Sequence, residues 1–177
     1  MTLSMPQAAL THPKILTLDD FMAVQHALPK GFRLVFTNGC FDVLHPGHVD
    51  LLARARALGH GLLLGLNSDA SVRRIKAHLG GGAAPGPARP LNSQDERAFV
   101  LAALESVDFV VIFDEDTPLE LIRAVRPQVL VKGGDWDVSR IVGREAVQAD
   151  GGQVLSLPLL PGYSTTGLIE RIRRGGA

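Results

Sequence analysis

The chain has 177 residues, and 18 lysines and arginines balance 18 aspartates and glutamates, so the formal net charge is zero. Nucleic-acid binders usually carry a basic excess, and disordered chains combine low hydrophobicity with high net charge, so this neutral, 46% hydrophobic sequence fits neither class. Its length suits one domain, expected at residues 14–174 after a flexible arm at residues 1–13. The single cysteine, Cys40, favours a reduced, cytoplasmic setting, and no apolar run approaches the roughly 20 residues of a membrane span.

The first half of the chain predicts alternating helices and strands. Helices are expected where a capping residue or a proline precedes apolar positions at helical spacing, and strands at short apolar runs. Residues 78–90 are rich in glycine, alanine and proline without a periodic pattern, which predicts a mobile loop. Before that loop we expect a helix at 18–28 capped by Thr17, a strand at 32–37, a helix at 46–58, a strand at 62–66 and a short helix carrying Val72 and Ile75.

The second half continues the alternation. After the loop we expect a helix at 93–104 with a capping box of Ser93 and Glu96, a strand at 108–113, a helix beginning at Thr117 and Pro118, a strand at 128–131, a helix near 142–149, a strand at 153–157 and a last helix opening at Thr165 or Thr166. This order indicates an α/β fold, a single Rossmann-like doubly wound parallel sheet of about five strands with helices on both faces. Such sheets bind ligands beyond the carboxyl ends of their strands.

The turn after the first of these strands, residues 37–48, reads Thr-Asn-Gly-Cys-Phe-Asp-Val-Leu-His-Pro-Gly-His. Gly39 lets the backbone approach a ligand, and Gly47 lies at a helix start, where free N–H groups attract phosphate. His45 and His48 flank that start and can donate hydrogen bonds to phosphate oxygens. The turn is not a Walker loop, because it has no Gly-Lys-Ser/Thr element. It predicts a phosphate-binding site.

Two other interpretations of this turn stay open. Each histidine could be structural, and Cys40, His45 and His48 could together bind a metal ion. The sequence offers no second cysteine or remote histidine cluster to complete a metal site. The Pro-Gly pair between the histidines also favours a turn against phosphate.

The turn resembles the His-x-Gly-His element of the cytidylyltransferase-like nucleotidyltransferases. The resemblance covers about residues 15–172 and is strongest with the bacterial branch that adenylylates D-glycero-D-manno-heptose 1-phosphate, the nucleotidyltransferase domain of a bifunctional heptose kinase/adenylyltransferase. Two stretches favour that branch, Val-Lys-Gly-Gly-Asp at 131–135 and Gly-Tyr-Ser-Thr-Thr at 162–166. The other carrying stretches lie at 67–72, 89–92, 101–110 and 114–122.

The resemblance implies transfer of an adenylyl group from ATP to D-glycero-D-manno-heptose 1-phosphate, giving ADP-heptose and pyrophosphate for lipopolysaccharide core biosynthesis. The attacking phosphate oxygen is already ionised at neutral pH, because the second pKa of a phosphate monoester is about 6. The enzyme must therefore supply positioning and charge neutralisation rather than a side-chain nucleophile. Mg²⁺ is expected with the ATP, without a predicted protein ligand. The family also implies a homo-oligomer.

The alternatives are another transferase of the superfamily, such as a glycerol-3-phosphate cytidylyltransferase, and a non-catalytic nucleotide-binding module. Base choice depends on backbone contacts that the sequence does not reveal. A binding module would retain the glycines but could lose the histidines, so the presence of both His45 and His48 argues against it. Neither a nucleic acid nor a membrane is expected as a partner.

Roles for individual residues follow from the resemblance and from side-chain chemistry. His45, His48 and Lys132 are expected to be catalytic. Some assignments have structural alternatives: core packing for Phe41, holding of the local turn for Asp42, a helix cap for Asp69 and for residues 164–166, and a solvated surface for residues 73–76. The sugar phosphate is expected to contact Asn67, Asp69, Lys76 and Arg97. The nucleotide is expected to contact Gly39, Cys40, Phe41, Asp42, Gly47, Gly133, Asp135, Tyr163, Ser164, Thr165 and Thr166.

Overall fold

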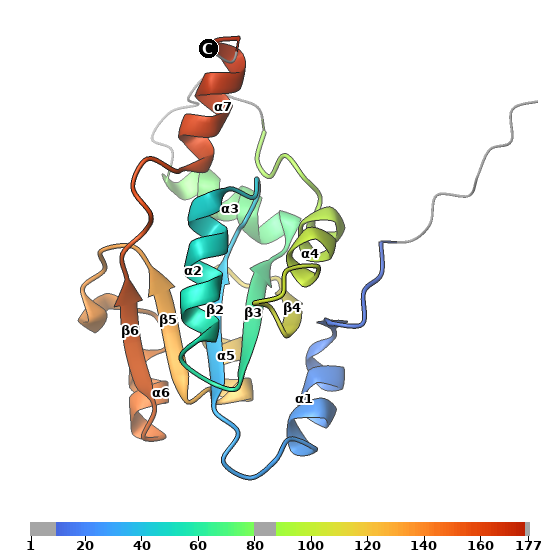
Figure 1. The fold of residues 1–177 in the computed structure, drawn as a ribbon, viewed down its shortest axis with the longest axis vertical. Coiled ribbons are helices and arrows are strands. Elements are labelled where there is room, and N and C mark those ends of the chain that lie inside the picture. The colour runs from blue at the N-terminus through green and yellow to red at the C-terminus, as the bar shows by residue number, and fades with distance from the viewer. Residues whose placement is uncertain (1–9, 80–87, 176–177) are drawn as a thin grey trace, which may run out of the picture.

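A parallel six-stranded sheet lies at the centre of the computed structural model, which describes residues 10–79 and 88–175 (Figure 1). The strand order is β1-β4-β3-β2-β5-β6, and each neighbouring pair is parallel. The predicted fold class is confirmed, with one strand more than the expected five. The strands are β1 (Ile15–Leu16), β2 (Leu34–Gly39), β3 (Gly61–Asn67), β4 (Phe109–Phe113), β5 (Val129–Gly133) and β6 (Gln153–Leu157).

The additional strand, β1, forms the edge of the sheet beside β4. It has two residues, Ile15 and Leu16, which pair with Val110 and Val111. A run of two apolar residues has no periodicity of its own, so only its partner strand makes it a strand. The last residues of the expected arm also pack here, because the ring of His12 contacts that of Phe99 edge to face. Residues 1–9 of that arm lie outside the described residues.

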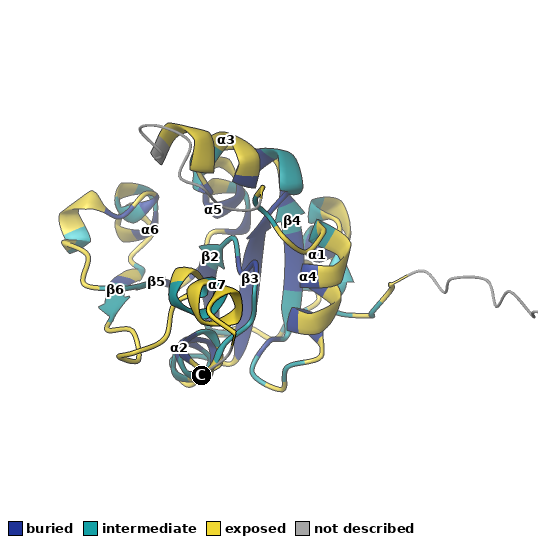
Figure 2. Cartoon of the chain, turned by 90° about the horizontal axis from the view of Figure 1, so that it is seen from above, coloured by how far each residue is buried: buried dark blue, intermediate teal, exposed yellow. Residues whose placement is uncertain are grey.

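Helices cover both faces of the sheet, and Figure 2 shows the buried strands between them. One apolar cluster joins α2 and α4 to one face, and a second joins α1, α5 and α6 to the other. The helices are α1 (Leu18–His26), α2 (Pro46–Arg56), α3 (Asp69–Leu79), α4 (Gln94–Ala102), α5 (Leu119–Val125), α6 (Arg144–Ala149) and α7 (Thr165–Arg173), with a 3₁₀ turn at Val138–Arg140.

The predicted helix starts are mostly confirmed by their caps. The Thr17 side chain accepts from the backbone N–H of Asp20, and Ser93 and Glu96 form the predicted capping box. Two starts lie further along the chain than predicted. Pro118 precedes α5 as its cap, and α6 begins only at Arg144, because Gly143 has a left-handed backbone with a φ of 88°.

Both ends of the expected loop at residues 78–90 are described. Residues 78 and 79 belong to α3, and Arg89 is ion-paired with Asp42. Residues 80–87 lie outside the described residues.

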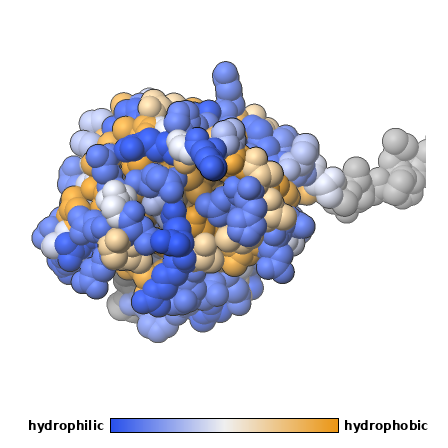
Figure 3. Space-filling model, turned by 90° about the horizontal axis from the view of Figure 1, so that it is seen from below, coloured by the Kyte–Doolittle hydropathy of each residue, from blue (hydrophilic) through white to orange (hydrophobic). Residues whose placement is uncertain are grey.

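The two ends of the sheet differ. Helix α7 stands beyond the carboxyl ends of the strands, and none of its residues is buried (Figure 1). The end at which the strands begin carries a mixed surface in which hydrophilic residues predominate (Figure 3). In the described ranges, no helix is long and apolar enough to cross a membrane.

Candidate active site

Two adjoining cavities open at the carboxyl ends of the central strands, where the strand order reverses between β2 and β5. The larger cavity has a volume of about 530 Å³ and the smaller one a volume of about 300 Å³. Parallel sheets bind ligands at such a reversal, in the crevice between loops that lead to opposite faces. The residues that line both cavities form what we call the junction: Asn38, Gly39, Cys40, Phe41, His48, Lys132 and Thr165.

His45 and His48 stack on each other at the start of α2. Their ring centroids lie 3.7 Å apart with an interplanar angle of 17°. Burial lowers the pKa of both imidazoles, that of His48 to about 4, where the neighbouring His45 is a second cause. Both rings are therefore neutral at pH 7. The buried Nδ1 atoms have no hydrogen-bond partner among the described residues.

The side chain of Phe41 forms part of the wall of the junction. Its backbone is left-handed with a φ of 43°, its side chain is only 7% exposed, and its ring lies 5.0 Å from that of His48. A Cβ atom on Gly39 would lie 2.8 Å from the Phe41 ring. Gly39 is therefore needed to seat this ring as well as to admit a ligand, and the core-packing interpretation of Phe41 is correct alongside its place in the wall.

Lys132 brings a partly buried positive charge to the junction. Burial lowers the pKa of its ammonium group, and the Cys40 thiol partly offsets that effect. Its Nζ lies 3.4 Å from Asn38 Oδ1, and no described carboxylate lies within ion-pair distance. A partly desolvated charge without a described counterion carries a cost, so this site favours an anionic ligand.

The start of α7 also lines both cavities. Ser164 caps the helix, because its side-chain oxygen accepts from the N–H of Gly167 at 3.0 Å. Thr165 faces both cavities, Thr166 the larger and Tyr163 the smaller. The helix start thus provides hydroxyl groups and free N–H groups for an anion.

The carboxylate of Asp42 is bonded to other protein groups rather than being free for a ligand. Its carboxylate is ion-paired with Arg89 and accepts from the N–H groups of Leu91 (2.6 Å) and Asn92 (3.1 Å). The Asn92 amide in turn donates to the Asp42 carbonyl at 2.7 Å. Asp42 therefore holds the segment at residues 89–92 against the histidine turn, although it also lies in the wall of the larger cavity.

Arg97 is buried at 2% exposure, behind the cavities rather than in them. Its guanidinium donates to the carbonyls of Cys40 at 2.7 Å and Asn67 at 2.9 Å, and to Asp69 Oδ1 at 2.7 Å. It thereby joins the carboxyl ends of β2 and β3 to the start of α3. The structure does not bring Arg97, Asp69 or the exposed Asp135 into either cavity.

The other predicted residues do meet at the two cavities. Asn67 and Lys76 line the larger one, and Gly47 and Gly133 line the smaller one. Sequence reasoning assigned no role to several further residues of the larger cavity. Residues 89 and 116 belong to stretches that resemble the family, but no local pattern indicates where their side chains point. The missed residues include Asn38, Arg89, Asp116, Thr117, Trp136 and Arg140.

A metal ion held by the protein alone has little support in this arrangement. Over residues 10–79 and 88–175, no group of three histidine, cysteine, aspartate or glutamate side chains could hold one. The acidic side chains of the larger cavity are already paired, Asp42 with Arg89 and Asp116 with Arg74. The donor set therefore fits a divalent ion that arrives bound to phosphate oxygens.

Comparison with known proteins agrees with the fold and with the motifs. The bifunctional protein HldE of Geotalea uraniireducens is 55% identical over 163 residues, which cover 92% of this chain and 31% of that protein. HldE of Rhodopseudomonas palustris is 56% identical over 146 residues, or 82% of this chain and 28% of that protein. The chain thus spans less than a third of the length of these relatives.

Two solved structures share the fold at low identity. A lipopolysaccharide core biosynthesis protein from Thermoplasma volcanium has a TM-score of 0.55 at 22% identity, over 73% of this chain and 98% of that one. Pantoate-beta-alanine ligase from Francisella tularensis has a TM-score of 0.56 at 13% identity, over 90% and 76%. The family described as "Cytidylyltransferase-like" matches residues 36–171. The chain therefore belongs to the cytidylyltransferase-like family of nucleotidyltransferases.

Proposed function

We propose that this chain transfers the adenylyl group of ATP to D-glycero-D-manno-heptose 1-phosphate, giving ADP-heptose and pyrophosphate for lipopolysaccharide core biosynthesis. The observation that carries the proposal is the junction, where the neutral His48 ring and the unpaired Lys132 ammonium face both cavities. Identity of about 55% to the HldE proteins, with the stretches at 131–135 and 162–166, supports the heptose branch.

In the proposed reaction, an oxygen of the sugar phosphate attacks the α-phosphorus of ATP. A new P–O bond forms as the bond from the α-phosphorus to the bridging oxygen breaks, and that electron pair leaves with pyrophosphate. The nucleophile is already ionised, so the junction needs no general base. Lys132 and the His48 ring instead stabilise the negative charge that accumulates on the α-phosphate. The start of α7 binds the leaving phosphates.

The two cavities suit the two substrates. The smaller one is walled by Leu51, Leu159 and Tyr163 beside Gly47, which is suited to a flat base with its ribose. The larger one is lined by the basic side chains of Lys76 and Arg89, which suits a sugar phosphate. The α-phosphate then lies at the junction that both cavities share.

In this proposal, several residues that were expected to contact a substrate position other parts of the site instead. Arg97 and Asp69 act through the backbone of Cys40 and Asn67, and Asp42 acts through the segment at 89–92. Asp135 lies outside both cavities, so the proposal assigns it no contact with the nucleotide.

Mg²⁺ belongs to the proposal as an ion that enters with ATP. When bound, it would neutralise charge on the phosphate oxygens while keeping several water ligands. A cytoplasmic location, which the single cysteine favours, and a homo-oligomeric assembly complete the proposal.

Pyrophosphate release tests the function directly. The purified chain is assayed with ATP, CTP or GTP, each paired with heptose 1-phosphate or glycerol 3-phosphate, in the presence of Mg²⁺. We expect release with ATP and heptose 1-phosphate. Preference for CTP with glycerol 3-phosphate would assign the other branch, and no release with any pair would favour a binding module.

A further inference from the structure

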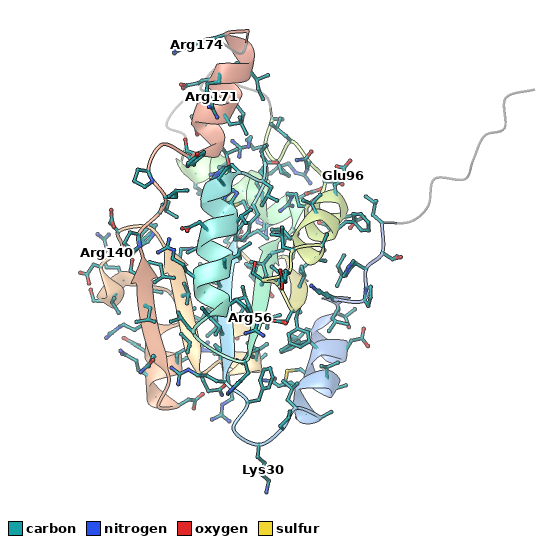
Figure 4. All side chains as sticks on the ribbon, in the orientation of Figure 1. Lys30, Arg56, Glu96, Arg140, Arg171 and Arg174 are labelled. Atoms are coloured by element: carbon teal, nitrogen blue, oxygen red, sulfur yellow. The ribbon has the colours of Figure 1, made fainter. Side chains whose placement is uncertain are left out.

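The chain has a single tryptophan, Trp136, and it stands in the wall of the larger cavity. Its side chain is 52% exposed, and it follows β5 in the segment that leads to the 3₁₀ turn. Figure 4 marks Arg140, at the end of that turn, near the carboxyl ends of β5 and β6. Single exposed apolar residues are common on protein surfaces, so the position alone would mean little.

The indole is held in place by the turn beneath it. Its Nε1 donates to the Gly133 carbonyl at 3.1 Å, and its backbone N–H donates to the Ser156 side chain at 3.0 Å. Gly134 has a φ of 118°, and a Cβ atom there would lie 2.8 Å from Nε1. The indole thus rests against the glycine pair with its polar edge satisfied internally. The part of the indole that remains open to the cavity is its flat, apolar ring surface.

The lining of the same cavity also includes polar groups. Asp116 and Thr117 line it from the segment after β4, whereas Trp136 comes from the segment after β5. In the sheet, β3 and β2 separate β4 from β5, so the cavity brings together segments that follow strands that are not neighbours. The Asp116 carboxylate is ion-paired with Arg74. A ligand in this cavity can therefore meet both an apolar indole plane and hydroxyl-binding groups.

A pyranose ring matches these walls, because it has an apolar C–H face and hydroxyl groups at its rim. We propose that Trp136 is a specificity-determining residue, whose indole stacks on the ring of the sugar phosphate while Asp116 and Thr117 bind its hydroxyls. The inference rests on the proposed function and names how that site recognises its acceptor. Trp136 does not line the smaller cavity assigned to the base.

Steady-state kinetics test the role. Trp136→Ala is expected to raise the KM for heptose 1-phosphate about tenfold, the scale of one aromatic contact, with the KM for ATP changed less than about twofold. Trp136→Phe, which keeps a flat ring, is expected to restore most of the affinity. Ile172→Ala on α7, an exposed apolar residue at 67% exposure outside both cavities, serves as the control. An unchanged KM for the sugar phosphate in Trp136→Ala would overturn the inference.

Fluorescence of the lone tryptophan gives a second measurement that does not need turnover. Titration of the wild-type chain with heptose 1-phosphate is expected to shift its emission, whereas glycerol 3-phosphate and inorganic phosphate, which have no ring, leave it unchanged. A shift with ATP alone and none with the sugar phosphate would place the base against Trp136 and refute the stacking role. Catalysis without any sugar-dependent shift would refute this inference alone, and a shift without pyrophosphate release would refute only the proposed function.

Discussion

Replacing Arg97 by methionine tests whether one buried guanidinium holds the carboxyl ends of β2 and β3 together. Methionine retains much of the apolar volume but donates no hydrogen bond. The change removes bonds to the carbonyls of Cys40, Asn67 and Asn92 and to the Asp69 carboxylate, at 2.7–3.1 Å. These acceptors lie at the base of the junction, so their loss affects the part of the fold on which the site is built.

The magnitude follows from the number of bonds and their burial. Each lost bond to a carbonyl is worth about 1 kcal/mol. The bond to Asp69 is worth about 1.5 kcal/mol, because that side chain is 24% exposed and water can partly replace the lost partner. The sum is a loss of about 4.5 kcal/mol in the free energy of unfolding. With a urea m value of about 2 kcal/mol/M, the midpoint of unfolding should fall by about 2 M.

Urea unfolding followed by circular dichroism measures this shift. Arg126→Met is the matched control, because Arg126 donates two hydrogen bonds to Asp150, at 2.8 and 2.7 Å, but its side chain is 68% exposed. We expect the control to unfold near the wild-type midpoint, since exposed ion pairs contribute little. A midpoint for Arg97→Met within about 0.5 M of wild type, or equal to that of the control, would refute the reasoning.

Three further predictions concern the junction. His48→Ala should lower turnover by about 10²–10³-fold with an unchanged circular dichroism spectrum, whereas the exposed His26→Ala should not; a folded His48→Ala variant with normal turnover would remove the histidine from the mechanism. Lys132→Ala should lower turnover by about 10²-fold, against no effect of Lys30→Ala at the far end of the sheet (Figure 4), and equal kinetics for the two variants would contradict its role. Because burial lowers the folded-state pKa of His48 to about 4, below the ordinary 6.5, the unfolded chain binds the proton first, and stability should fall as the pH drops from about 6.5 to about 4. Urea midpoints at pH 7 and pH 5 should therefore differ less for His48→Gln than for wild type, and an identical pH dependence would show that His48 does not titrate in this way.

Much of the site could be predicted because its signals are local. The histidine turn, the lysine near the carboxyl end of β5 and the start of α7 each lie at or beside the carboxyl end of a strand, and parallel sheets bring these ends together. Arg97 shows the limit of that reasoning. Its charge suggested a phosphate contact, yet the packing of α4 turns the side chain toward the backbone carbonyls of Cys40 and Asn67.

The missed residues share a different cause. Trp136 and Asp116 follow strands that are not neighbours in the sheet, and nothing in either segment indicates a common cavity. The edge strand β1 was missed for a related reason, since two residues become a strand only through pairing with β4. Each of these features depends on contacts between distant parts of the chain.

By itself, the sequence determined that strands and helices alternate and where most helices begin, and it predicted a phosphate-binding turn at residues 37–48. Those properties depend on residues a few positions apart, through capping and the period of apolar side chains. Only the tertiary structure decided that His45 and His48 stack with lowered pKa values, that Arg97 is enclosed and that Trp136 borders a cavity. Burial and direction are set by the order of the strands and by what packs over them, and no local pattern carries that information.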